Sequence, residues 1–245
     1  MSAAGMIIPG PSISPRFKAR LAGVCEALEG VTSTYGQVTV VGKVLVSGSA
    51  AATAANILGH ERLFWLGFAS ALLGVAFHVA WTLLFYDLFK PVNKTISLLA
   101  AFFGLVACAL LAFACLFYIA PLALLDHPQY FSAFTPAQVQ ALASLFLRLN
   151  GQAFNIFLVF FGMRLLFTGY LIFKSTFMPR IIGVFVAIDG IGWMLYLHPA
   201  LGMRLFLYIA IAAGLAEIPL QLWLIIMGVN SQRWRDQAAA AATRA

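Results

Sequence analysis

Charged residues are scarce in this sequence. They make up 9% of its 245 residues, while 62% are hydrophobic and the mean hydropathy is +0.95. Because a soluble domain typically carries about 25% charged residues, this composition excludes a soluble globular protein. The long uncharged runs instead predict membrane-spanning helices, each of which needs about 20 apolar residues to cross the hydrocarbon core.

Cysteine and histidine are also few. The three cysteines, Cys25, Cys108 and Cys115, lie inside apolar runs, so we expect packing residues and no disulfide framework. No His-Glu-x-x-His or Glu-x-x-His motif is present, which predicts no metal site. A carboxylate-rich site with His78 as its one nitrogen ligand, holding Mn, Fe or Zn, stays open as an alternative.

Long basic runs with interleaved aromatic residues are missing too. The net charge of +7 comes from lysines and arginines that lie mostly in short loops and tails between apolar runs. This distribution sets membrane topology and excludes nucleic acid as a partner.

The apolar runs predict an all-α fold, a polytopic membrane helix bundle of about six transmembrane spans. The spans are Leu21–Val41, Leu63–Phe85, Ile96–Leu124, Phe146–Phe173, Ile181–Leu197 and Leu205–Val229. Residues 1–15 lack the apolar core of a signal peptide and are interpreted as a disordered cytoplasmic tail. Residues 16–230 then form the transmembrane domain, and residues 231–245 form a second cytoplasmic tail.

Two of the connections contain helix signals of their own. Ser49–Gly59 is alanine-rich, and Thr135 precedes Pro136 with Gln138 at the third helical position, which is a capping-box pattern. We expect short helices at both places, either as interfacial entries to the following spans or as a lid over an outward opening.

Lysine and arginine are distributed unequally between the two sides of the bundle. With the N-terminus inside, the cytoplasmic side holds Arg16, Lys18, Arg20, Lys90, Lys94, Lys174, Arg180, Arg233, Arg235 and Arg244. The outer side holds Lys43, Arg62, Arg148 and Arg204. This bias predicts a multi-pass protein of the cell (inner) membrane with both termini in the cytoplasm.

Several short segments resemble one known family. They include Arg20-Leu21-Ala22-Gly23, Ala51-Ala52-Thr53-Ala54-Ala55-Asn56-Ile57, Pro91-Val92-Asn93-Lys94, Gly169-Tyr170-Leu171-Ile172 and Pro179-Arg180-Ile181-Ile182-Gly183. In order and spacing, the region from Arg16 to Val229 resembles the bacterial membrane-protein family catalogued as domain-of-unknown-function family 4386. The resemblance implies about six spans and no established activity, substrate or cofactor.

Four residues of this chain depart from the pattern of the family that it resembles. Glu26 and Glu29 stand where members are apolar, His78 where an acidic residue is common, and Arg164 where histidine is common, whereas Glu217 matches. An activity typical of the family therefore need not transfer to this chain.

Ionisable residues inside the predicted spans are the candidate functional residues, because a charge at the membrane centre costs about 2.5–3.5 kcal/mol or more. They are Glu26, Glu29, His78, Arg164, Asp189 and Glu217, from five of the six spans. Counted from the cytoplasmic ends at 1.5 Å per residue, all of them lie in one layer about 9–18 Å deep. The layer predicts a polar site in the cytoplasmic half of the bundle.

Helical spacing places several of these residues on polar or small-residue stripes. The stripes are Glu26, Glu29, Ser33 and Gln37 on the first span, Gly67, Ser70, Gly74 and His78 on the second, and Gly214, Glu217 and Gln221 on the sixth. The second stripe is suited to the close approach of another helix.

Four carboxyl groups (Glu26, Glu29, Asp189 and Glu217) share the layer with one arginine and one histidine. Uncompensated negative charges cannot persist in a low-dielectric layer, so either some acids are protonated or a cation is bound. The alternative is structural: Arg164 and His78 neutralise two acids, and the others hydrogen-bond as neutral acids between helices.

Four functional hypotheses follow from this layer. The first is a pocket that binds a small amphiphilic ligand or a cation through Glu26, Glu29, His78, Arg164 and Gln221. The second is an enzyme in which Glu217 and Asp189 are the catalytic acid and base for a lipid or isoprenoid substrate. The third is a proton- or cation-coupled transporter, and the fourth is a structural accessory subunit. The predicted partners are the lipid bilayer and a lipid or small amphiphile, a homo-oligomer stays open, and the sequence indicates no particular cofactor.

Overall fold

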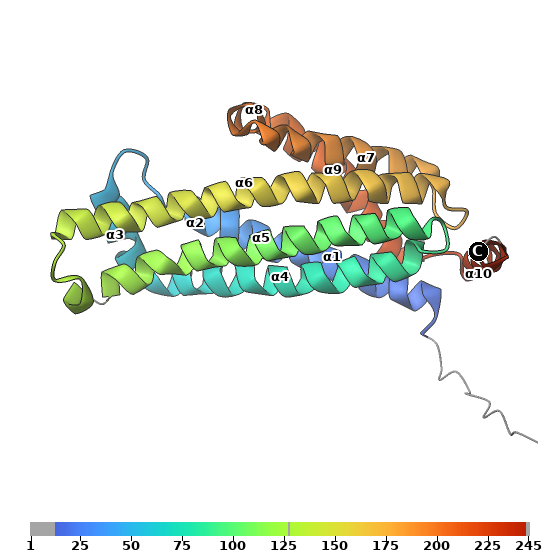
Figure 1. Cartoon of the computed structure of the whole chain (residues 1–245), viewed down its shortest axis with the longest axis horizontal. Coiled ribbons are helices and arrows are strands. Elements are labelled where there is room, and N and C mark those ends of the chain that lie inside the picture. Colours follow the sequence, from blue (N-terminus) through green and yellow to red (C-terminus); the bar gives the residue numbers. More distant parts are fainter. Residues whose placement is uncertain (1–12, 127, 244–245) are drawn as a thin grey trace, which may run out of the picture.

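The computed structural model describes residues 13–126 and 128–243, and every regular element in these residues is a helix (Figure 1). The first 12 residues of the predicted N-terminal tail lie outside the described part. Five segments are long and apolar enough to cross a membrane: α4 (Glu61–Phe89), α5 (Lys94–Asp126), α6 (Pro136–Lys174), α7 (Arg180–Met194) with the 3₁₀ turn η3 (Leu195–Leu197), and α9 (Phe206–Leu222) with the π-helix η4 (Trp223–Met227). They confirm a helical chain of membrane character and correspond to the last five predicted spans.

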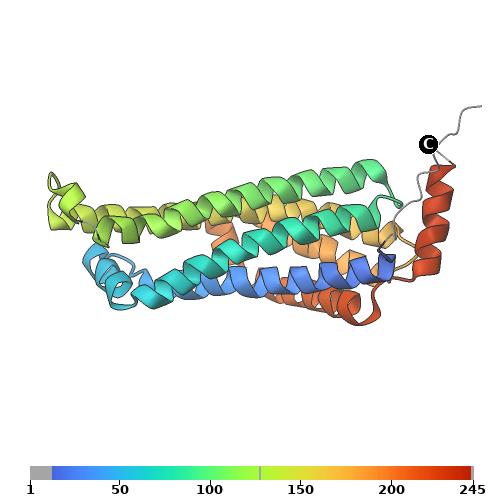
Figure 2. The ribbon, with the colours of Figure 1, turned by 90° about the horizontal axis from the view of Figure 1, so that it is seen from below.

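The first predicted span is helical but differs in composition from the other five. The helix α1 (Pro15–Ser33), the π-helix η1 (Thr34–Val40) and α2 (Val41–Val44) follow one another without a break and run beside α4 (Figure 2). Ser14 caps α1 by accepting a hydrogen bond from the Phe17 amide. Charged residues such as Arg20, Glu26 and Glu29 make α1 less apolar than the five long helices.

Both expected short helical starts are present. Ser49 caps α3 (Ala50–Gly59), and Thr135 with Gln138 forms a complete capping box at the start of α6. However, the helix that begins at Pro136 does not end before the predicted fourth span. It continues for 39 residues to Lys174, because residues 137–150 contain no glycine or proline that would interrupt it.

The remaining short elements lie at the connections. They are η2 (Pro128–Phe131), α8 (Pro199–Arg204) and α10 (Ser231–Ala242). The helix α10 lies in the segment expected to be a C-terminal tail, and the Asn230 side chain caps it by accepting from the Arg233 amide at 3.0 Å. An alanine-rich sequence behind this cap explains why the tail is helical.

The long helices pack around one another in chain order. α1 packs on α4, α4 on α5, α5 on α6, α6 on α7 and α7 on α9, and η4 returns to contact α1. The hairpin of α7 and α9 covers only part of α6, at the end where α10 lies (Figure 1). The polar layer predicted from the sequence therefore lies inside a ring of helices.

The small-residue stripe on α4 lies against the first helix, as its spacing predicted. A Cβ on Gly36 would lie 2.5 Å from the Gly67 carbonyl oxygen, and a Cβ on Gly74 would collide with Ser33 Oγ. Ser70 Oγ donates a hydrogen bond of 3.0 Å to the Thr32 carbonyl. These contacts hold α1 and α4 close enough for their polar side chains to meet.

Glycines also set the contact between α6 and α7. A Cβ on Gly162 would lie 2.5 Å from the Gly190 carbonyl oxygen, and one on Gly169 would lie 2.6 Å from the Ala187 nitrogen. Both neighbours are backbone atoms, so they cannot move aside without displacing a helix.

We therefore expect Gly162→Ala to lower the free energy of unfolding by about 1–3 kcal/mol, the usual cost of overpacking. Gly151→Ala is the matched control on the same helix, because nothing lies within 4 Å of its added Cβ. Unfolding in detergent, followed by circular dichroism, measures both variants. Equal stability of the two variants would contradict the close packing of α6 on α7.

Candidate functional site: a buried ionic chain between helices

Three side chains from three helices form a chain in the interior of the bundle. Arg164 Nη1 on α6 lies 3.0 Å from His78 Nε2 on α4, and His78 Nδ1 lies 3.6 Å from Glu29 Oε1 on α1. Ser33 Oγ donates to the same Glu29 oxygen at 3.1 Å. The exposed fractions are 1% for Arg164, 0% for His78 and 6% for Glu29, so the chain is shielded from solvent and lipid.

Aromatic rings and a glycine position the arginine. The guanidinium carbon of Arg164 lies 3.1 Å from the centroid of the Trp81 ring, a close cation–π contact. A Cβ on Gly104 of α5 would lie 3.1 Å from Arg164 Cδ, so glycine leaves the room that this side chain needs. The rings of Trp81, Phe157 and Phe161 also surround His78, with centroids 5.1–5.8 Å from its own.

Glu26 lies about one turn before Glu29 on α1 and is 3% exposed. Its charged neighbours are Arg164, Glu29 and Asp189, and its Oε2 has no hydrogen-bond partner among the described residues. Two carboxyl groups of one helix thus share Arg164, the one arginine that is buried among the described residues.

Asp189 and Glu217 form a second acidic pair beside this chain. They lie on α7 and α9 and face each other, with the Trp193 indole next to Asp189. Asp189 is fully buried, and neither of its oxygens has a hydrogen-bond partner among the described residues. Glu217 and Gln221, about one turn further along α9, are partly exposed.

A polar contact continues from this cluster toward the far end of the bundle. Gln37, in the π-helix η1, lies about one turn beyond Ser33, and its Oε1 accepts a 3.0 Å hydrogen bond from Asn150 Nδ2 of α6. Asn150 Nδ2 also donates to the Ala114 carbonyl of α5 at 2.9 Å. The predicted stripe on the first span is therefore buried along its whole length.

A small cavity adjoins the ionic chain. A cavity of about 10 Å³ lies beside Arg164, Thr82 and Thr168, on the order of the room that one water molecule needs. In the described part of the chain, no group of three His, Cys, Asp or Glu side chains is arranged to hold a metal ion. A water molecule, and not a larger ligand, fits this cavity.

Comparison with known proteins identifies the family of this chain. Residues 21–228 match the model of a family described as Domain of unknown function (DUF4386). The chain belongs to this family. No curated protein and no solved structure matches the chain.

This match confirms the family expected from the sequence, and all seven candidate residues lie inside the matched region. The structure brings Glu26, Glu29, His78 and Arg164 together, and places Asp189 and Glu217 as a pair next to them. Gln221 belongs to the same face of α9. The sequence interpretation missed Trp81, although its position three residues after His78 places both rings on one helix face.

Proposed function

We propose that this DUF4386 chain is a six-span protein of the bacterial cell membrane, with α1, η1 and α2 as the first span and both termini in the cytoplasm. The uninterrupted helix from Pro15 to Val44 is about 45 Å long at 1.5 Å per residue, sufficient to cross. Described basic residues at the end that carries α10 are Arg16, Lys18, Arg20, Lys90, Lys94, Lys174, Arg180, Arg233 and Arg235. The positive-inside rule supports a cytoplasmic location for that end.

Within this architecture, we propose that the buried cluster binds a proton and passes it through the bundle. The observation that carries this proposal is the Arg164–His78–Glu29 chain, which joins three helices beside a cavity of single-water size. Glu29 from α1, Arg164 from α6 and the three aromatic rings described above face His78. Glu26 from α1 and Cys108 from α5 lie next to Arg164.

Proton binding fits the charge balance of the layer. Four carboxyl groups and one arginine cannot all be charged in a low-dielectric interior, since each uncompensated charge costs several kcal/mol. A proton is the smallest cation that removes one of these charges, and it needs no cavity. Ser33, Gln37 and Asn150 extend the polar path beyond Glu29.

Proton flux into liposomes tests the proposal. Under a potassium diffusion potential that is negative inside, we expect the reconstituted protein to acidify the lumen faster than protein-free liposomes do, as followed with a trapped pH-sensitive dye. Glu29→Gln should reduce this rate to that of protein-free liposomes, because an amide cannot release a proton. Glu61→Gln, the same change at the exposed start of α4, is the matched control and should keep the native rate.

Two results would overturn the proposal. One is a native rate no higher than that of protein-free liposomes, which would favour the structural alternative. The other is an unchanged rate in Glu29→Gln, which would show that this carboxyl group does not lie on the proton path.

A second candidate function is acid–base catalysis on a lipid or isoprenoid. The observation in its favour is the facing pair of Asp189 and Glu217, two carboxyl groups from different helices, one fully buried and the other partly exposed. A pair in unequal surroundings can divide into a protonated acid and an ionised base. Asp189→Asn should then abolish turnover of such a substrate and leave the Glu29-dependent proton flux intact.

A further inference from the structure

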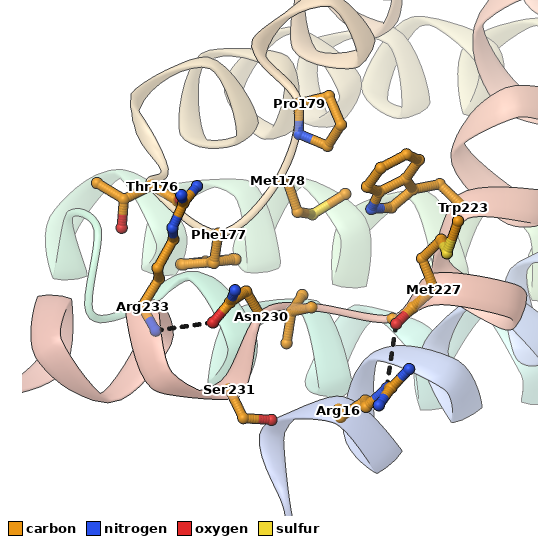
Figure 3. Close-up of a pocket in the computed structure, with 12 residues that line it drawn as sticks. Arg16, Thr176, Phe177, Met178, Pro179, Trp223, Met227, Asn230, Ser231 and Arg233 are labelled. Atoms are coloured by element: carbon orange, nitrogen blue, oxygen red, sulfur yellow. Dashed lines mark hydrogen bonds between the residues drawn. The ribbon is translucent and has the colours of Figure 1, made fainter.

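A large cavity lies at the end of the bundle that carries α10, away from the ionic chain. Its volume is about 630 Å³, and it is formed by the start of α1, the connection between α6 and α7, and the segment that joins η4 to α10 (Figure 3). Its lining residues include Arg16, Thr176, Trp223, Met227, Asn230 and Arg233. Three segments that are distant in the sequence therefore build one recess.

The cavity is basic and contains no acidic side chain among its lining residues. Arg16 and Arg233 are its two charged residues, and neither forms an ion pair within the described part of the chain. Arg16 Nε donates to the Met227 carbonyl at 3.2 Å, and Arg233 Nη1 donates to the Thr176 carbonyl at 3.4 Å. A guanidinium has five N–H donors, so both side chains keep donors for an anion.

A neighbouring hollow extends the positive region. It has a volume of about 480 Å³, shares Thr176, Met178 and Arg233 with the first cavity, and adds Arg180. Its one acidic lining residue, Asp236, accepts a hydrogen bond from Gln232 at 2.9 Å and forms no ion pair with Arg180 or Arg233. Three arginines thus surround a continuous recess.

The other wall of the cavity is apolar. Phe177, Met178, Trp223 and Met227 line it, and the apolar segment of α9 and η4 ends at Met227. With the membrane placement proposed above, on which this inference rests, the cavity lies at the level where hydrocarbon gives way to lipid headgroups, a depth at which tryptophan is favoured. A ligand there would present an anionic group to the arginines and an apolar group to Trp223.

We infer that this recess is a binding site for an anionic phospholipid, whose phosphate contacts the arginines at its edge. Arginine recognises phosphate through paired N–H donors, and basic recesses at the cytoplasmic ends of membrane helices suit acidic lipid headgroups. The site is separate from the ionic chain and does not depend on the proton-binding proposal.

One glycine fixes the position of the first arginine. Gly228, which ends η4, has φ +67, in the left-handed region that favours glycine. A Cβ at this position would lie 2.9 Å from Arg16 Cγ. The tight turn thus places the start of α1 directly against the end of η4, with the Arg16 guanidinium at the cavity.

Native mass spectrometry in a neutral detergent tests the inference. The full-length protein is titrated with phosphatidylglycerol, with phosphatidylcholine of the same acyl chains, and with inorganic phosphate. We expect one phosphatidylglycerol per chain to bind most tightly. Arg16→Gln/Arg233→Gln should weaken its binding about tenfold to a hundredfold, as expected for the loss of charge-assisted hydrogen bonds.

The matched control is Arg235→Gln/Lys94→Gln, which removes the same charge at the same end from exposed residues that do not line the cavity. It should bind phosphatidylglycerol as the native chain does. Because Arg16 also holds the end of η4, the single variant Arg233→Gln and a melting curve of each protein separate loss of binding from loss of structure.

Three outcomes would overturn the inference. Equal binding of phosphatidylcholine would show that the site does not recognise the negative charge of the headgroup. Binding of inorganic phosphate as tight as that of the lipid would identify a free anion as the ligand. Native affinity in a folded Arg16→Gln/Arg233→Gln protein would place the lipid elsewhere.

Discussion

Arg164→Met is expected to lower the free energy of unfolding by about 3–5 kcal/mol, the typical cost of removing one partner from a buried ionic pair. Arg164 is 1% exposed and contacts His78 Nε2 at 3.0 Å. Its charge also interacts with the carboxyl groups of Glu26 and Glu29. Methionine fills much of the volume but leaves these carboxyl groups without compensation.

Two further variants make the Arg164 prediction specific. Arg148→Met, on the exposed surface of the same helix, should change stability by no more than about 0.5 kcal/mol. Arg164→Met combined with Glu29→Gln should recover part of the loss, because the second change removes a carboxylate that the first left unpaired. Reversible unfolding in mixed micelles measures all three proteins. A single variant as stable as Arg148→Met, or a double variant with purely additive losses, would disprove the ionic coupling.

Trp81→Ala is the second large effect, with an expected loss of about 3–5 kcal/mol. Trp81 is 0% exposed, and its ring lies beneath the Arg164 guanidinium and 5.1 Å from the centroids of both His78 and Phe85. Removal of the ring creates a cavity. It also abolishes the cation–π contact, which accounts for about 2 kcal/mol of this loss because the cation is desolvated.

Trp65→Ala is the matched control for this prediction, on the same helix. Trp65 is 47% exposed, so its truncation leaves no enclosed cavity. The two variants are compared by the denaturant midpoint and by the proton flux into liposomes, since Trp81 holds Arg164 in the proposed path. Equal midpoints for the two tryptophan variants would mean that the Trp81 ring does not support the ionic chain.

Much of the fold follows from local sequence patterns. Five apolar runs predicted the helices that the structure contains, because a span needs only length and hydropathy. Helical spacing also placed Glu29, Ser33 and Gln37 on one buried face. The end of the helix that begins after Thr135 was missed, since a capping box marks where a helix starts and carries no information about its length.

The pairing of side chains between helices could not be predicted in the same way. The contact of Asn150 with Gln37 joins residues 113 positions apart, and periodicity on each helix does not say which face of another helix it meets. The recess at Arg16 and Arg233 has the same origin, because it forms only where the start of α1 meets two connections from later in the chain. Spacing along one helix does give the distance of a residue from the end of that helix, which is why residues at similar distances could be grouped into one predicted layer.

The unequal lengths of the helices have a consequence for the surrounding lipid. At 1.5 Å per residue, the 39 residues of α6 extend about 58 Å, whereas the 18 residues of α7 and η3 extend about 27 Å. A hydrocarbon core of about 30 Å matches the second length and not the first. If the helices cross such a core, α7 and α9 match its thickness, whereas α5 and α6 extend beyond it and require tilt, local bilayer thickening or helix ends outside the hydrocarbon. Because the mismatch falls on one side of the bundle, we expect the stability of the protein to depend on bilayer thickness.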